Sequence, residues 1–212
     1  MKIVVGGSYH NPNWNEVKKV MEDLTKAGHE IIAPGGEWQP ININDEFVKF
    51  KGEDEVPREI LQNEFNRKIC DDTDAFVAVD SNGYLGYTVT QELLYAILVN
   101  LSLHRRFLVY FTEEPAIFQI IEEDGISAPI QFPNGKQRKF IGPDELRKGL
   151  EKRGLNIIQE EYDKLYPMHY KLYELINDYS VVCKIGIDEL FEPEKMGELP
   201  NIPGTGHGRQ IF

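Results

Sequence analysis

The sequence contains four short runs of apolar residues, separated by segments with the three- and four-residue spacing of amphipathic helices. They lie within residues 3–5, 30–33, 74–80 and 107–111, where the second segment begins at Glu30 and the third is bounded by Asp74 and Asp80. Continuous apolar runs of this length are typical of strands buried on both faces of a parallel sheet, and the segments between them supply the crossovers. We therefore predict an α/β fold: an open, mostly parallel, flavodoxin- or Rossmann-like sheet with helices on both faces.

Three helices are expected between these strands. Their apolar periodicity predicts helices over 13–27 and 57–72, and a third that begins at Thr88 or Thr90 and runs through Leu98. Residues 37–57 show no clear period and are expected to form a long functional flap.

The chain beyond residue 112 gives weaker signals. The pattern predicts helices over 143–152 and 162–177, with strands at 155–158 and 179–187. We expect a core at 1–112 and a C-terminal α+β extension at 113–212, which packs on the core or on a neighbouring subunit. The last 21 residues, from 192, read as a Pro/Gly-rich tail.

Charge and cysteine content exclude several classes of protein. The chain has 212 residues, with 23 Lys and Arg against 35 Asp and Glu, for a net charge of −12. Such an acidic chain is not expected to bind nucleic acid, because phosphate contacts need basic residues. No apolar stretch is long enough to span a membrane. Cys70 and Cys183 match no metal or redox spacing, so we expect a cytoplasmic protein without a disulfide framework.

The candidate site lies where strands end, because ligands of open α/β sheets bind beyond the carboxyl ends of the strands. Gly6-Gly7-Ser8-Tyr9 follows the first strand, and Asp80 leads through Gly83 to Gly86 after the third. Glycine lets the backbone approach a ligand, and a serine hydroxyl can donate to a sugar or phosphate oxygen. The alternative is that the glycines only make a tight strand exit.

Glu92 is the most informative acidic residue. It lies in the first turns of a mostly apolar helix, where the helix dipole stabilises a carboxylate. Such a carboxylate can serve as a nucleophile toward an electrophilic carbon. The alternative is an ordinary surface glutamate on an amphipathic helix.

These residues together resemble the nucleoside 2-deoxyribosyltransferase superfamily, which includes deoxynucleotide N-glycoside hydrolases. The resemblance rests on the Gly-Ser exit of the first strand and on the segment from Asp74 through Gly83-Tyr84-Leu85-Gly86 to Glu92 and Tyr95-Ala96, in which Asp74 and Glu92 are 18 residues apart. It implies that Glu92 is the nucleophile. Asn66 stands where the family has an aspartate, and Gly86 stands where the family has an acid. Either Tyr84, Thr88 or Thr90 then assists proton transfer, or the acid is lost.

The resemblance also implies a set of substrate contacts. Ser8 and Tyr9 would hold the sugar or a 5′-phosphate, and Asn66 would bind the base or sugar. Trp38 and Tyr84 would stack on the base, although for Trp38 the preferred interpretation is an anchor in the core or in the loop. Arg67, Lys68, Arg105 and Arg106 are the cations that could neutralise a phosphate, or they are simply solvated. The substrate-binding residues expected in this way are Gly6, Gly7, Ser8, Tyr9, Asp74, Asp80, Gly83, Gly86 and Thr88.

The function expected is glycosyl transfer or hydrolysis at the N-glycosidic bond of a (deoxy)nucleoside or nucleotide, with no cofactor and no metal. The resemblance further implies a homo-oligomer with shared active sites, completed by the C-terminal tail with Arg209. Two alternatives remain open at this point: a non-catalytic nucleotide-sensing domain, and a glycohydrolase acting on NAD or another nucleotide.

Overall fold

The computed structural model describes residues 1–8, 13–33, 40–42, 49–50, 56–70, 73–105, 107–131, 135, 137–178 and 181–191. Tyr9, Trp38, Arg106 and the C-terminal tail with Arg209 were expected to contribute to the site, and they lie outside these ranges. Within the described residues, no helix combines the length and apolar character needed to cross a membrane.

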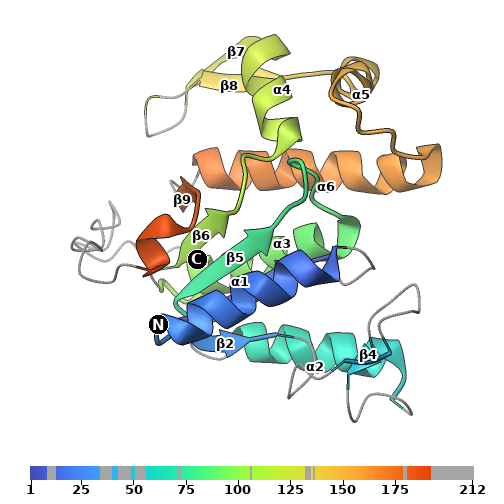
Figure 1. The fold of residues 1–212 in the computed structure, drawn as a ribbon. Coiled ribbons are helices and arrows are strands. Elements are labelled where there is room, and N and C mark those ends of the chain that lie inside the picture. Colours follow the sequence, from blue (N-terminus) through green and yellow to red (C-terminus); the bar gives the residue numbers. More distant parts are fainter. Residues whose placement is uncertain are drawn as a thin grey trace.

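A five-stranded parallel sheet forms the centre of the molecule (Figure 1). Its strands, in spatial order, are β2 (Glu30–Ile32), β1 (Lys2–Gly7), β5 (Ala75–Val79), β6 (Leu108–Phe111) and β9 (Val182–Ile185). The predicted α/β fold with an open parallel sheet is confirmed. From β1 the chain first adds β2 on one side and later β5 on the other, so the strand order reverses between β1 and β5.

Side-chain alternation along the strands assigns one helix layer to each face of the sheet. Ile3, Val5 and Val77 point to the face covered by α1 (Trp14–Lys26). Val4 and Phe76 point to the opposite face, which is covered by α2 (Arg58–Cys70), α3 (Tyr87–Ser102) and α6 (Gln159–Asp178). Because both faces are buried, the strands carry the near-continuous apolar runs seen in the sequence.

The third predicted helix begins earlier than its threonines suggested. Gly86 is the N-cap of α3, with extended backbone at φ −67° and ψ 163°, and Tyr87 is the first helical residue. The hydroxyl of Thr90 donates to the Gly86 carbonyl from inside the helix instead of capping its start.

The C-terminal half completes the sheet, so a boundary at residue 112 does not divide the fold. Strand β9, predicted within 179–187, pairs in parallel with β6, and α6 packs along α3. Residues 155–158, predicted as a strand, form no regular element, and α6 continues through Pro167. The sequence pattern gave no indication of α4 (Ala116–Asp124) or of the hairpin β7 (Ile126–Gln131) with β8 (Gln137–Phe140).

Four smaller elements complete the described chain. The predicted helix at 143–152 is α5 (Pro143–Lys152), and a 3₁₀ turn, η1 (Asp188–Phe191), follows β9. Within the segment expected to be a flap, β3 (Pro40–Asn42) pairs antiparallel with β4 (Lys49–Phe50).

A row of tyrosines on α6 binds the chain between β8 and α5, which lie in the upper part of Figure 1. The hydroxyls of Tyr162, Tyr166 and Tyr170 donate to the backbone carbonyls of Pro143, Ile141 and Lys139, respectively. Their rings follow one another at 6.1 Å between centroids. The chain from the end of β8 to the start of α5 is therefore held against α6 by hydrogen bonds to its main chain.

Candidate functional site

The candidate site lies at the carboxyl end of β1, beside the point where the strand order reverses. Gly6 and Gly7 pair with Ala78 and Val79 of β5, so both strands end at the same edge. In open α/β sheets this reversal point is where ligands bind. The location predicted for the site therefore coincides with the switch point of the observed sheet.

The two glycines of β1 are required by close packing on opposite faces. A Cβ at Gly6 would come within 2.5 Å of the Phe76 ring and 3.5 Å of Glu92 Oε2. A Cβ at Gly7 would come within 2.5 Å of a methyl group of Val17 in α1. Close packing thus accounts for both glycines, and the Glu92 carboxylate also lies close to the strand at Gly6.

Glu92 is buried, with only 4 % of its surface exposed, and it projects from the second turn of α3. It is therefore not an ordinary surface glutamate. Gln62 Nε2 donates to Glu92 Oε1 at 2.7 Å. Burial raises the pKa of Glu92 to about 7, and the hydrogen bond from Gln62 opposes this rise. A carboxyl group with this pKa exchanges its proton near neutral pH.

Gln62 joins Glu92 to Asn66. Its amide nitrogen also lies 3.2 Å from Asn66 Oδ1, one helical turn further along α2. Both hydrogens of this amide are thus directed at oxygen atoms of the site. The structure brings Gly6, Asn66 and Glu92 together as expected, and adds Gln62, which the sequence analysis missed. The four-residue spacing between Gln62 and Asn66 on one predicted helix was the available signal.

Asp80 is a second buried carboxyl group at the same edge, directly after β5. Its Oδ1 accepts hydrogen bonds from the Thr112 hydroxyl at 2.6 Å and from the Glu113 backbone N–H at 2.8 Å. Its Oδ2 is buried without a hydrogen-bond partner. Burial raises the pKa of Asp80 to about 6, against the opposing effect of these hydrogen bonds. Asp80 thereby links the ends of β5 and β6.

Ser8 and Thr88 are two further predicted substrate-binding residues, Ser8 just beyond β1 and Thr88 on α3. Ser8 directly follows β1, next to Gly7, and Thr88 lies one helical turn before Glu92 in α3. Both side chains are partly exposed. Their positions are compatible with contact to a ligand at the strand end.

The resemblance implied substrate contacts for three residues of the loop before α3, and the structure gives them other contacts. These residues are Gly83, Tyr84 and Gly86. The Tyr84 hydroxyl donates to Glu161 of α6, and burial together with this carboxylate raises the pKa of Tyr84 above its usual value. Gly83 has a positive φ of 71°, and a Cβ there would lie 2.9 Å from the Ala116 backbone nitrogen. Gly86 caps α3. The proton-transfer role expected of Tyr84 therefore finds no support in its placement, because its hydroxyl contacts α6.

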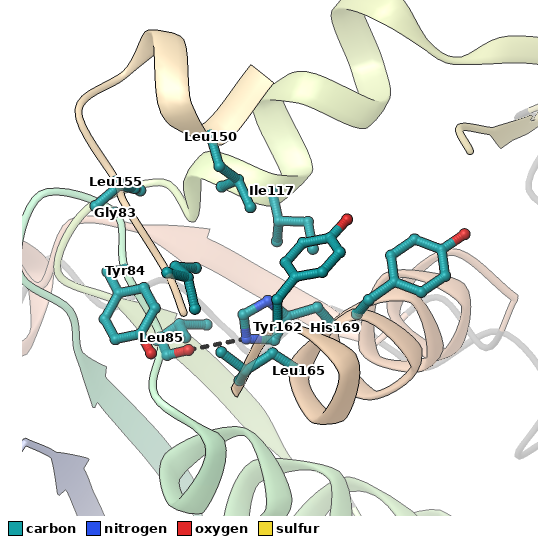
Figure 2. Close-up of a pocket in the computed structure, with 11 residues that line it drawn as sticks. Gly83, Tyr84, Leu85, Ile117, Leu150, Leu155, Tyr162, Leu165 and His169 are labelled. Carbon is teal, nitrogen blue, oxygen red and sulfur yellow. Dashed lines mark hydrogen bonds between the residues drawn. The ribbon is translucent and has the colours of Figure 1, made fainter. Parts of the chain in front are cut away.

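Figure 2 shows a small cavity beside these residues, between the 83–85 loop and helices α4, α5 and α6. Its volume is about 10 Å³, room for about one water molecule. Its lining includes Tyr84, Tyr162 and His169 but neither Gln62 nor Glu92. The cavity is thus separate from the candidate site.

His169 connects α6 to the start of α3 by hydrogen bonds. Its Nε2 lies 2.9 Å from the Leu85 carbonyl oxygen (Figure 2). It also lies 2.9 Å from Thr90 Oγ1. Because a carbonyl can only accept, Nε2 carries the proton and donates. Burial lowers the pKa of His169 to about 4, so the ring is neutral at physiological pH. This histidine holds the loop that leads to Glu92.

Asp74 and the expected cations lie away from Glu92. Asp74 precedes β5, and its Oδ2 accepts from the Lys2 backbone N–H at 2.7 Å, at the amino edge of the sheet. Arg67 and Lys68 are on the exposed side of α2. Arg105 follows the C-terminal end of α3, also remote from the strand ends. The placement of Asp74 speaks against its expected contact with substrate at this site.

The described part of the chain contains no group of three His, Cys, Asp or Glu side chains that could hold a metal ion. What the site offers instead is a buried carboxyl group with a pKa near neutrality, an amide pair and a glycine strand end. No known protein family, curated protein or solved structure matches this chain.

Proposed function

We propose that the chain is an enzyme that cleaves the N-glycosidic bond of a (deoxy)nucleoside or nucleotide, with Glu92 as the nucleophile. The observation that carries this proposal is the Glu92 carboxyl group, buried at the switch point with one oxygen held by Gln62 and the other beside Gly6. The chain resembles the nucleoside 2-deoxyribosyltransferases in residues 1–112, and this resemblance indicates the N-glycosidic bond as the bond that Glu92 would attack.

The reaction proceeds by two displacements at one sugar carbon. A Glu92 oxygen forms a bond to C1′ while the C1′–N bond breaks, and the bonding electrons leave with the base, which takes up a proton from solvent water. Water or a second base then displaces Glu92 from C1′, giving hydrolysis or transfer with retained configuration. Asn66 hydrogen-bonds the base or sugar but cannot supply the proton, since an amide does not titrate.

A nucleotide-sensing domain without turnover is the second candidate. The observation that favours it is the absence of an acid at the start of α3, where Gly86 supplies only backbone. Binding without base release would distinguish this candidate from the enzyme.

The test is base release from a panel of deoxynucleosides, ribonucleosides, their 5′-monophosphates and NAD. We expect release from at least one of them, and Glu92→Gln to reduce it by about 10³-fold or more. Glutamine at 92 still accepts the Gln62 hydrogen bond, so the fold is retained. Glu64→Gln, an exposed glutamate on α2, is the matched control and should keep full activity.

Mass spectrometry of the reacted protein locates the nucleophile. A sugar adduct on the peptide that contains Glu92 is the expected result. Full activity in Glu92→Gln, or no release from any member of the panel, would overturn the proposal.

The homo-oligomer implied by the resemblance is part of this proposal. It rests on the resemblance alone, because the structure contains a single chain.

A further inference from the structure

The side-chain amide of Gln62 has a defined orientation. Its nitrogen Nε2 donates to Glu92 Oε1 at 2.7 Å and to Asn66 Oδ1 at 3.2 Å. Because a carboxylate oxygen and an amide oxygen only accept hydrogen bonds, the group that faces both of them is the NH₂ of Gln62 and not its carbonyl. Rotation of the amide by half a turn would bring three oxygen atoms together. Both N–H donors of Gln62 are therefore engaged by protein acceptors.

The carbonyl oxygen of the same amide, Gln62 Oε1, is left for another donor. Among the described residues, no donor makes a hydrogen bond to this oxygen. The oxygen is also not enclosed in the core, since the buried side-chain atoms without a partner in the described chain are Asp80 Oδ2, Asn100 Oδ1 and Arg138 Nε. Gln62 thus presents an accessible acceptor on the same amide that holds the Glu92 carboxylate.

The displacement at C1′ decides which substrate group can reach this acceptor. Glu92 attacks from the side of the sugar opposite to the departing base, and the attacking oxygen lies about 3–3.5 Å from C1′ in a productive complex. In a β-nucleoside the 2′- and 3′-hydroxyls lie on that side of the ring, whereas the base and the 5′ carbon lie on the other side. The 2′-hydroxyl belongs to the carbon next to C1′, so it is the donor nearest to Glu92 and to the amide that holds it.

We propose that Gln62 is a specificity-determining residue whose Oε1 accepts a hydrogen bond from the 2′-hydroxyl of the substrate, so that the site selects ribonucleosides over 2′-deoxyribonucleosides. The inference rests on the proposed function, since it takes the attack of Glu92 on C1′ as its starting point. One side chain then serves both partners of the reaction: its nitrogen orients the nucleophile and its oxygen binds the sugar.

Three sugars separate the position of the hydroxyl from its presence. A 2′-deoxyribonucleoside places a CH₂ group against Gln62 Oε1, which loses its water without gaining a donor. An arabinonucleoside has a 2′-hydroxyl, but this group lies on the same side of the ring as the base and away from Gln62. Both compounds should therefore lack the hydrogen bond that the ribonucleoside makes.

The experiment measures the affinity of Glu92→Gln for the ribo-, 2′-deoxyribo- and arabinonucleosides of adenine, guanine, cytosine and uracil by isothermal titration calorimetry. Glutamine at 92 keeps the contact with Gln62 and prevents turnover. We expect the ribonucleoside to bind about 10-fold more tightly than the other two sugars with the same base. Gln62→Leu in the same background should make the three affinities equal. Gln91→Leu, at an exposed glutamine on α3, is the matched control and should keep the difference.

Equal affinities for the three sugars, no binding of any of them, or a difference that persists in Gln62→Leu would overturn the inference. The comparison among sugars needs only Glu92→Gln, so it decides the matter even where circular dichroism shows that Gln62→Leu does not fold. Base release by the wild type tests the proposed function separately. Release without a ribonucleoside preference in binding overturns this inference alone, whereas preferential binding without release overturns the enzyme and assigns the ribonucleoside to a binding domain.

Discussion

The molecule has two buried carboxyl groups at the carboxyl edge of its sheet, and they are held in different ways. Asp80 is bound by a backbone N–H and by the hydroxyl of Thr112 at the end of the neighbouring strand, so it connects β5 to β6. Glu92 receives one hydrogen bond, from the side chain of Gln62 on another helix. Burial raises the pKa of both groups.

The difference shows which carboxyl group stabilises the fold and which is available for chemistry. A carboxyl group bound to main chain on a neighbouring strand supports the fold, and its removal leaves a donor unpaired. A carboxyl group held by one amide side chain on a separate helix contributes little to the fold, and its burial as an anion costs free energy. We therefore expect opposite effects on stability when the two are replaced.

Removal of Asp80 should give the largest effect. At pH 5, where burial keeps this carboxyl group largely protonated, Asp80→Ala is expected to lower the free energy of unfolding by about 4 kcal/mol. The cause is the loss of hydrogen bonds to Thr112 and Glu113 together with the space left behind. Urea denaturation measures the change, and a loss below about 1 kcal/mol would contradict the structural role.

Replacement of Glu92 should have the opposite sign, and only at high pH. The pKa of Glu92 is about 7 in the folded chain against an ordinary value of 4.5, so the folded state binds the proton more tightly. Stability from this group is therefore complete below pH 4.5 and is lost as the pH rises through 7. Glu92→Gln removes that loss, so it should gain up to about 3 kcal/mol at pH 8 and almost nothing at pH 4.5. Urea denaturation at the two pH values provides the test, and an equal effect at both would refute the pH linkage.

Removal of the Gln62 amide should give the smallest of the three effects. The hydrogen bond from Gln62 lowers the pKa of Glu92, so Gln62→Leu should raise it further, by about one pH unit. Carbon-13 NMR titration of the Glu92 carboxyl measures this without relying on activity, and the midpoint of the pH–rate profile should move with it. Asn63→Leu, an exposed neighbour on α2, should leave the midpoint unchanged. A midpoint that stays in place in Gln62→Leu would mean that Gln62 does not tune Glu92.

The sequence predicted those parts of the fold in which local pattern and tertiary environment agree. The runs at 3–5, 75–79 and 108–111 are apolar because both faces of the sheet are covered, so their strands were recognisable. Residues 155–158 carry a similar short apolar run but form no strand, because strand pairing depends on neighbours that are distant in sequence. The hairpin β7–β8 has no clear alternation, and its register is broken by an irregularity, so it was missed.

The candidate site was predictable only in part, for a related reason. Glu92 and Gly6 could be identified from their positions relative to a helix start and a strand end. Gln62 offered only its four-residue spacing from Asn66 as a signal, because its partner Glu92 is 30 residues away and the contact depends on how α2 packs against α3. Tyr84 and Asp74 were placed by analogy with a motif, and their hydroxyl and carboxyl groups instead contact α6 and the start of β1.

The spacing of the tyrosine hydroxyls on α6 fixes where the β7–β8 hairpin and α5 lie along that helix. Four residues of α-helix rise about 6 Å, and two residues of extended chain advance about 6.6 Å. Hydroxyls four residues apart on α6 can therefore meet every second carbonyl between 139 and 143. A slip of one residue would set the hydroxyls against the intervening peptide units, whose carbonyls point the other way. The position of the hairpin and of α5 along α6 is thus set in discrete steps.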